Sequence, residues 1–426
     1  MDIFGILSMI GGLALFLYGM EAMGAGLSKL SGGRMERLLE KLTSKRIMAV
    51  LLGAGVTAVI QSSSATTVMV VGFVNSGIMK LNQAVGIIMG ANIGTTITSW
   101  LLSLTGIQGS SFILKMLKPS SFSPILAIVG IIFIMFTKDE KKKDIGGIFL
   151  GFAILMYGME AMSGAVAPLA DNEKFTGILT MFSNPILGLL AGTILTAVIQ
   201  SSSASVGILQ ALCATGAVNF STALPIIMGQ NIGTCVTAII SSIGTSKNAK
   251  RAAAVHLFFN ISGTVIFMVV FYTLNTFVHF SFLNTAASPA GIAVIHSLFN
   301  IGATILLFPF ANLLEKMAIL AIPDKGSEVE EMEEEKINPD LARLDERFLD
   351  KPGFAMEECR GVAINMARKS KKAMNLAIDL LGEYSDKTAD RVEKLENQID
   401  QYEDALGTYL VKLSGRELSI KDSRVL

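Results

Sequence analysis

The sequence carries little charge over its first 323 residues, and it contains only three cysteines and three histidines. Residues 1–323 hold 29 charged side chains, whereas residues 324–426 hold 41. The net charge is zero, which excludes a basic nucleic-acid-binding protein. Cys213, Cys235 and Cys359 follow no CxxC spacing, so neither a disulfide framework nor a zinc site is supported. The uneven charge instead predicts a membrane region followed by a soluble tail.

The charge-poor region also lacks the residues of an enzyme active site. Between Phe175 and Ser246 there is no Asp, Glu, Lys, Arg or His, and between Ile47 and Leu114 only Lys80 is charged. The region offers no His, carboxylate and nucleophile set, no metal-ligand cluster and no Walker glycine loop. We therefore expect a protein that is not an enzyme and that holds its ligand with neutral groups.

Three blocks of sequence occur twice, each at a shift of 139 residues. The pairs are Tyr18–Met23 with Tyr157–Met162, Thr57–Ala65 with Thr196–Ala204, and Ile87–Thr95 with Ile226–Thr234. Only Ala91 changes, to Gln230. A constant offset over three separate blocks indicates two copies of one unit. A smaller echo at a shift of 40 relates His256 and Asn260 to His296 and Asn300.

Basic residues in the loops indicate that the two copies have opposite orientations. The loop after the first Tyr-Gly-Met-Glu block contains Lys29, Arg34, Arg37, Lys41, Lys45 and Arg46. The matching loop of the second copy contains only Lys174. Further basic clusters at 138–143 and 247–251 follow the two copies. Because loops rich in Lys and Arg stay in the cytoplasm, the pattern predicts an inverted repeat.

Polar residues interrupt one long apolar stretch in each copy. Gln61, Ser62, Ser63 and Ser64 fall in the middle of such a stretch, where a continuous lipid-facing helix would not place them. The pattern predicts broken helices or membrane hairpins that meet inside the protein. Since Asn and Thr are good N-caps, both Asn-Ile-Gly-Thr blocks are expected to begin a second half-helix.

The expected fold is therefore an all-α polytopic membrane protein with two inverted repeats, broken helices or hairpins, and a cytoplasmic helical-bundle tail. The apolar N-terminus is expected to form the first transmembrane helix rather than a signal peptide. Apolar residues at helical spacing after residue 338 predict amphipathic antiparallel helices. The expected units are 1–137 (repeat 1), 145–323 (repeat 2 and trailing helices), 324–337 (acidic linker) and 338–426 (helical cytoplasmic domain).

The ligand chemistry follows from hydroxyl, amide and helix-end groups placed at mid-membrane. Helix N-termini with free N–H groups suit an oxyanion, and hydroxyl or carbonyl oxygens suit a hard cation such as sodium. Burying an oxyanion without Lys or Arg costs on the order of several kcal/mol unless another charge offsets it. The absence of fixed positive charge thus favours cation-coupled anion transport.

These motifs resemble those of a known family. The doubled Gln-Ser-Ser-Ser, each copy followed by a G-x-N-I-G-T block at Asn92 or Asn231 and then by His256-Leu-Phe-Phe-Asn260, resembles the type II sodium/phosphate cotransporters, in particular their bacterial branch. The similarity spans roughly residues 5 to 312. The acidic linker and helical tail resemble the PhoU-like regulatory domain of bacterial members.

The resemblance implies specific ligand sets. It implies that phosphate is bound by Gln61, Ser62, Ser63, Ser64, Asn92, Gln200, Ser201, Ser202, Ser203 and Asn231. It implies sodium at Gln200, Ser201, Thr234 and Thr237, and internal symmetry extends this to Thr66, Thr95 and Thr98. His256 and Asn260 are expected to support the site. Sodium is the only metal expected, and there is no cofactor. Cys235 stands where the first copy has Thr96, so the two halves do not offer identical ligands.

The favoured function is a secondary symporter that couples sodium to uptake of inorganic phosphate by alternating access, in the bacterial cytoplasmic membrane with a cytoplasmic tail. Phosphate, sodium and the lipid bilayer are the expected partners, without nucleic acid. One alternative is a membrane phosphate sensor that acts through the tail on a regulatory partner. Another is sodium-coupled transport of a different oxyanion. The sequence also leaves open a packing role for the serines, a structural or relay role for His256 and His296, the sodium stoichiometry and the oligomeric state.

Overall fold

The computed structural model describes residues 3–31, 45–107, 116, 118–170, 172–323, 340–416, 418 and 420–426. In these residues the chain is helical, and a single isolated bridge between Asn219 and Ala286 is the β pairing they contain. Seven of the described helices are long and apolar enough to cross a membrane. The predicted acidic linker at 324–337 lies outside the described residues, as do Arg34, Arg37 and Lys41.

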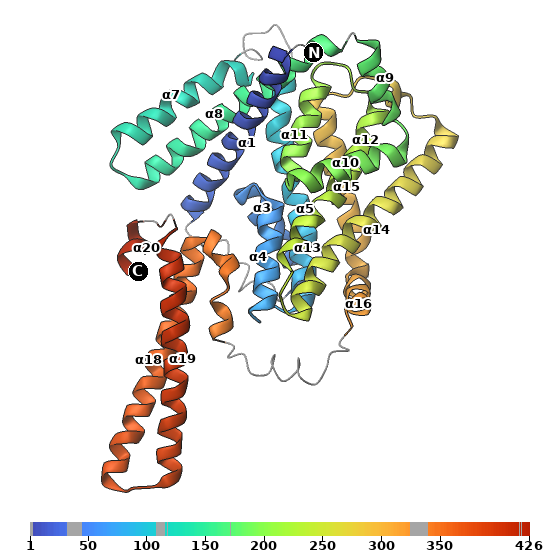
Figure 1. The fold of residues 1–426 in the computed structure, drawn as a ribbon. Coiled ribbons are helices and arrows are strands. Elements are labelled where there is room, and N and C mark those ends of the chain that lie inside the picture. Colours follow the sequence, from blue (N-terminus) through green and yellow to red (C-terminus); the bar gives the residue numbers. More distant parts are fainter. Residues whose placement is uncertain are drawn as a thin grey trace.

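The repeated sequence forms two matching sets of helices (Figure 1). The first set is α1 (Ile3–Ser31), α3 (Arg46–Ile60), α4 (Ser63–Asn75) and α5 (Leu81–Ser103), followed by the 3-10 turn Leu104–Gly106 and α7 (Pro119–Phe136). The second set is α8 (Glu140–Val166), the turn Ala167–Leu169, α9 (Glu173–Met181), α10 (Pro185–Ile199), α11 (Ser202–Cys213), α12 (Phe220–Gly233) and α13 (Cys235–Ser241). The ends of α3 and α10 correspond residue for residue at the offset of 139.

Three helices follow the second set, and a helical tail follows them. The three helices are α14 (Lys247–Val278), α15 (Pro289–Leu307) and α16 (Ala311–Ala321), with 3-10 turns at Ser281–Asn284 and Phe308–Phe310. The tail contains η5 (Leu341–Arg343), η6 (Glu346–Asp350), α18 (Pro352–Gly382), α19 (Asp386–Ser414) and α20 (Ile420–Val425). Figure 1 shows α18 and α19 as a long hairpin that projects from one end of the molecule.

The first helix of each set packs closely against that of the other. A methyl group added at Gly12 would lie 3.0 Å from the Gly158 carbonyl oxygen, and one added at Gly19 would lie 2.6 Å from the Gly151 carbonyl oxygen. Only glycine allows the backbones to approach this closely. Since the lower-numbered glycine of α1 meets the higher-numbered glycine of α8, the two helices run antiparallel.

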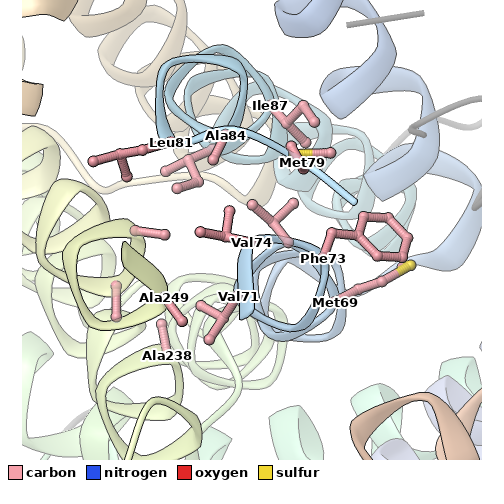
Figure 2. Packing of buried hydrophobic residues seen from close by; sticks show 14 of the residues in the cluster. Met69, Val71, Phe73, Val74, Met79, Leu81, Ala84, Ile87, Ala238 and Ala249 are labelled. Carbon is pink, nitrogen blue, oxygen red and sulfur yellow. The ribbon is translucent and has the colours of Figure 1, made fainter. Parts of the chain in front are cut away.

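The half-helix α4 lies in the main hydrophobic core. Figure 2 shows Val74 directed toward Leu81 and Ala84 of α5, and Val71 directed toward Ala238 of α13 and Ala249 of α14. These side chains are buried, although α4 has only 13 residues. Burial on several sides by both repeats holds this short helix, because a helix of its length is marginal alone.

The prediction that both Asn-Ile-Gly-Thr blocks begin a half-helix was wrong for the first copy, whereas in the second copy Thr234 is the N-cap of α13. In the first copy α5 continues through Asn92 and Gly94 to Ser103 without a break. In the second copy α12 ends at Gly233, but Thr234 keeps a right-handed helical φ of −59° and α13 begins at the next residue. The glycine serves close packing instead of a helix start, since a methyl group at Gly94 would lie 2.5 Å from the Ala54 carbonyl oxygen of α3.

The amphipathic pattern predicted for the tail is present in α18 and α19. Ala373, Leu376 and Leu380 are partly buried along one face of α18, while their neighbours are exposed. On α19 the half-buried Val392 and Leu395 lead to the buried Leu406. Each hairpin helix therefore covers an apolar stripe against the other.

Candidate functional site

The site is built on two helix breaks of the same construction. Gln61 ends α3 and Gln200 ends α10, both in the left-handed region with φ of 61° and 58°. The next residue is an extended serine that caps the following helix: Ser62 Oγ accepts from the Ala65 amide at 3.1 Å, and Ser201 Oγ accepts from the Ala204 amide at 3.2 Å. Each helix is therefore broken at Gln-Ser, as predicted: the glutamine is a left-handed C-cap of one helix, and the serine after it is the N-cap of the next.

The two breaks meet each other inside the protein. Ser63 Oγ lies 3.4 Å from Ser202 Oγ, and these two residues occupy the same position in the two copies. Ser64 Oγ also donates to the Gln200 carbonyl oxygen at 3.3 Å. Both Ser63 and Ser202 are buried. Contact between equivalent residues of two copies is what a pseudo-two-fold axis through this point produces.

The electrostatics of this junction favour an anion. The half-helices α4 and α11 begin at Ser63 and Ser202, so two helix N-termini converge on one place. Each N-terminus carries roughly half a positive charge and free N–H groups. No Lys or Arg is present near these breaks in sequence, because residues 47–79 and 175–246 contain none. Helix dipoles and hydroxyl donors are thus the positive groups this junction offers to an oxyanion.

The two glutamines are used differently. Gln61 is buried, and its Oε1 accepts from Thr98 Oγ1 at 2.9 Å while its Nε2 donates to the Ala58 carbonyl oxygen. Gln200 is exposed, and its backbone carbonyl oxygen accepts from Thr237 Oγ1 at 3.5 Å. The structure therefore brings Thr98 of α5 to the first break and Thr237 of α13 to the second.

The remaining threonines expected to bind sodium bond to their own helices. Thr95 Oγ1 donates to the Ala91 carbonyl at 3.0 Å, and Thr234 Oγ1 donates to the Gln230 carbonyl at 2.9 Å. Thr66 Oγ1 donates to the Ser62 carbonyl at 3.1 Å. Each hydroxyl oxygen keeps lone pairs for a cation. The described residues hold no group of three His, Cys, Asp or Glu able to bind a transition metal.

The two asparagines are buried but not joined to the breaks. Among the described residues, no hydrogen bond connects Asn92 or Asn231 to Gln61–Ser64 or Gln200–Ser203. Asn231 Nδ2 donates to the Ile227 carbonyl at 3.0 Å, whereas Asn92 Nδ2 has no partner. A buried amide without a partner is costly, so Asn92 retains a donor for a ligand. Their role in phosphate binding stays a prediction.

The second copy contains buried polar groups that the sequence reasoning missed. Both polar atoms of the Gln230 side chain lack a partner, and so do the hydroxyls of Thr196 and Ser205. In the first copy the equivalent Thr57 Oγ1 donates to Thr66 Oγ1 at 3.0 Å. Gln230 replaces Ala91 and is the one change in its repeated block. This difference between the copies was the signal in the sequence that could have pointed to the buried polar groups.

The two histidines of the 40-residue echo, on α14 and α15, also differ in their partners. His296 Nδ1 lies 2.6 Å from Ser99 Oγ, whereas His256 Nδ1 is buried without a partner. At the offset of 139, Ser99 corresponds to Ala238, which carries no hydroxyl. Asn260 Nδ2 donates to the His256 carbonyl at 2.9 Å and approaches Cys235 Sγ at 3.4 Å. His256 and Asn260 therefore lie beside the second Asn-Ile-Gly-Thr block.

Two cavities lie away from the breaks. One of about 520 Å³ is lined by Trp100, Ile107 and other apolar residues together with Ser103. Another of about 290 Å³ is lined by Lys118, Glu160 and Ser163, together with Ala211 of α11. Neither includes a residue of the Gln-Ser-Ser-Ser segments, so the convergent helix ends, rather than cavity size, define the candidate site.

Comparison with known proteins places these features in a family. The family model described as Na+/Pi-cotransporter matches residues 15–164 and again residues 154–288. The "Uncharacterized protein YqeW" of Bacillus subtilis is 29% identical over 315 residues, which cover 74% of this chain and 97% of the relative. The "Putative inorganic phosphate export protein YjbB" of Salmonella typhimurium is 26% identical over 425 residues, covering 98% of this chain and 73% of the relative.

A mammalian relative matches a shorter stretch. The "Sodium-dependent phosphate transport protein 2A" of Rattus norvegicus is 39% identical over 113 residues, which cover 25% of this chain and 17% of that protein. No solved structure matches the chain. The double match of one family model agrees with the duplication seen in the sequence and in the helices.

Proposed function

Because this chain belongs to the Na+/Pi-cotransporter family, we propose that it is a secondary active symporter that moves inorganic phosphate together with sodium by alternating access. Membership makes it a membrane transporter and not an enzyme. The observation that carries the proposal is the contact of Ser63 with Ser202, where two half-helix N-termini meet in a region without basic side chains. Phosphate is held between the two Gln-Ser-Ser-Ser segments.

Sodium coupling follows from the charge of the site. A buried phosphate at this junction meets helix dipoles and hydroxyls, which offset only part of its charge. Co-bound sodium offsets the rest, with Gln200, Ser201, Thr234 and Thr237 as one ligand set and Thr66, Thr95 and Thr98 as another. The carbonyl of Gln200 and the hydroxyl of Thr237 already lie 3.5 Å apart, which supports the first set. The proposed sodium-ligand sets are surrounded by four further polar residues: Asn92, Asn231, His256 and Asn260.

The proposed architecture is an inverted repeat in a bacterial cytoplasmic membrane. Two observations support it: α1 and α8 run antiparallel, and the basic loops alternate along the chain. With the basic loops inside, the tail is cytoplasmic. The tail is proposed to be a PhoU-like regulatory module, supported by its long antiparallel helices.

Export is a second candidate for the direction of transport. The sequence favours uptake driven by inward sodium movement. Relatives named for phosphate export, however, align with 98% of this chain, tail included, whereas the rat sodium-dependent transporter aligns with only 25%. If so, the direction of phosphate transport depends on the sodium and phosphate gradients and on the tail, rather than on the residues that bind phosphate.

The test is labelled-phosphate flux in proteoliposomes. Sodium gradients are imposed in each direction, with potassium replacing sodium as a control, and Gln200→Ala and Ser202→Ala are compared with Gln398→Ala in the tail. We expect sodium-dependent flux that both site variants abolish and the tail variant preserves. Phosphate flux only from inside to outside would select export. Competition by sulfate would indicate that the substrate is another oxyanion. No flux under any gradient would favour the alternative of a membrane phosphate sensor that acts through the tail.

A further inference from the structure

The first part of the tail packs on the end of α4 that lies away from the candidate site. Phe348 and Phe354 form an aromatic cluster with Phe73 of α4, with ring centroids 5.4, 5.2 and 5.0 Å apart. All three side chains are at most 1% exposed. Such buried aromatic contacts contribute strongly to an interface. The cluster therefore fixes the tail to one particular half-helix.

Polar contacts join the same tail segment to both repeats. Asn75, the last residue of α4, donates from Nδ2 to Asp345 Oδ2 at 3.0 Å. Arg347 pairs with Asp345 at 2.6 Å, and its Nη1 donates to the Ser241 carbonyl at 3.1 Å. Ser241 is the last residue of α13. A cation at a helix C-terminus satisfies a free carbonyl and complements the helix dipole.

The two contacted elements also carry the candidate site. The other end of α4 begins at Ser63, and α13 carries Thr237 one turn before Ser241. Asn75 Oδ1 further accepts from the Ser246 amide at 2.9 Å, which ties the same point to the start of α14. One short tail segment thus fastens parts of the site contributed by both copies.

We propose that residues 345–354 form a clamp that holds α4 and α13 in their present arrangement and slows the transport cycle. This inference rests on the proposed function, because alternating access requires the hairpin α3–α4 to move relative to the rest of the site. A tail segment that binds α4 and α13 at once stabilises one arrangement over the others, and whatever detaches the tail speeds transport.

Two variants break the clamp from opposite sides. A methyl group at Gly72 would lie 2.8 Å from the Phe348 ring, and its three nearest atoms all belong to that ring, so Gly72→Leu displaces Phe348. Arg347→Ala removes the contact with Ser241 from the tail side. Gly55→Ala is the matched control, because a methyl group added there on α3 has nothing within 4 Å.

The primary measurement is sodium-dependent phosphate flux in proteoliposomes with the full chain. We expect Gly72→Leu and Arg347→Ala each to raise the flux about threefold or more, since losing one buried contact shifts a two-state population by at least about that factor. The double variant should show no further increase than the larger single effect, because either change alone detaches the same tail segment. Gly55→Ala should match wild type.

A second measurement reports on the clamp without transport. Spin labels at Lys80→Cys and Lys387→Cys, both exposed positions, measure the distance between the membrane region and the tail hairpin. The native cysteines are buried, so the labels attach selectively. Cys359 checks that the tail stays folded: burial raises the pKa of its thiol to about 12, and it reacts only if the tail core opens.

The combined outcomes decide the proposal. A broadened distance distribution with faster flux and an unreactive Cys359 supports the clamp as a brake. A broadened distribution with unchanged or slower flux overturns it, and so does a distribution that stays narrow in the double variant. If wild type and variants carry no flux under any cation gradient while the distribution broadens, the proposed transport fails and the tail contact alone stands.

Discussion

At Gln61 and Gln200 the chain adopts left-handed backbone conformations that cost a non-glycine residue roughly 1–2 kcal/mol. Gln61→Gly removes that strain together with the amide that accepts from Thr98. We expect Gln61→Gly to unfold at or above the wild-type temperature in detergent, while phosphate flux falls by about tenfold, the effect of losing about 1.4 kcal/mol of binding.

Gln61→Val is the matched variant for this prediction. A β-branched residue at positive φ is strained, so we expect it to unfold at a lower temperature than wild type. Wild-type flux in Gln61→Gly would show that only the backbone turn matters and that the amide has no role in binding.

The unequal histidines yield a second prediction at the residue scale. Ala238→Ser introduces, at the position equivalent to Ser99, the kind of hydroxyl that Ser99 provides to His296. We expect it to stabilise the protein by about 1 kcal/mol, because a hydroxyl at the position equivalent to Ser99 is expected to reach the buried His256 Nδ1, which has no partner. The measurement is the unfolding temperature in detergent, and Ser99→Ala, which leaves His296 Nδ1 unpaired, should lower it.

The outcome for Ala238→Ser separates two roles for His256. Loss of sodium-dependent flux with higher stability would mean that the free nitrogen belongs to the transport cycle. Lower stability would mean that the space beside His256 does not admit a hydroxyl, and the proposed symmetry of the two histidine environments would be wrong.

Residue identities predicted the helix breaks but not all of their partners. Gln-Ser within an apolar stretch was enough to place the breaks at Gln61 and Gln200. The bond from Thr98 to Gln61 depends on how α5 packs beside α3, which local sequence does not encode. For the same reason the sequence did not show that Gln230 is buried with both polar side-chain atoms lacking partners, because this depends on the packing of the fold.

At the scale of elements, paired glycines set the spacing between helices. A methyl group at Gly90 would lie 2.0 Å from the Val50 carbonyl oxygen, and one at the equivalent Gly229 would lie 2.0 Å from the Leu189 carbonyl oxygen. We expect Gly90→Ala and Gly229→Ala each to destabilise the protein by about 3 kcal/mol or more, because backbone atoms must move apart. Thermal unfolding in detergent measures this.

Gly147→Ala provides the control for the close-packed glycines. A methyl group there has no neighbour within 4 Å, so the unfolding temperature should stay at or slightly above the wild-type value. Equal unfolding temperatures for Gly90→Ala and Gly147→Ala would contradict the tight contact of α5 with α3.

The same glycines explain why one element was predicted wrongly. Asn92 with Gly94 has the composition of a helix start, yet α5 runs through both. Capping preferences favour a helix start only where the chain is free to turn, and here α3 packs on α5 along its length. The 139-residue offset, in contrast, matched α3 with α10 correctly, because repetition reports on the whole unit and not on one local preference.

At the scale of the whole molecule, an inverted repeat predicts opposite exposure of equivalent loops. Lys45 ends the basic loop after α1 in the first copy, and Lys174 lies in α9, in the matching segment of the second copy, while Lys250 lies near the start of α14. We expect an impermeant maleimide to label Lys174→Cys in intact cells, and to label Lys45→Cys and Lys250→Cys only after permeabilisation. The wild-type chain gives a low background, since Cys213, Cys235 and Cys359 are all buried.

This experiment also tests the origin of the candidate site. In the proposed inverted repeat, which the antiparallel α1 and α8 and the contact of Ser63 with Ser202 support, one hairpin enters from each side of the membrane. Two N-termini then meet at mid-depth, and a phosphate held there is reachable from either side when one repeat moves relative to the other. Labelling of all three positions from the same side would mean that the copies are parallel. In that case the two helix ends could not belong to hairpins from opposite faces, and alternating access would need another explanation.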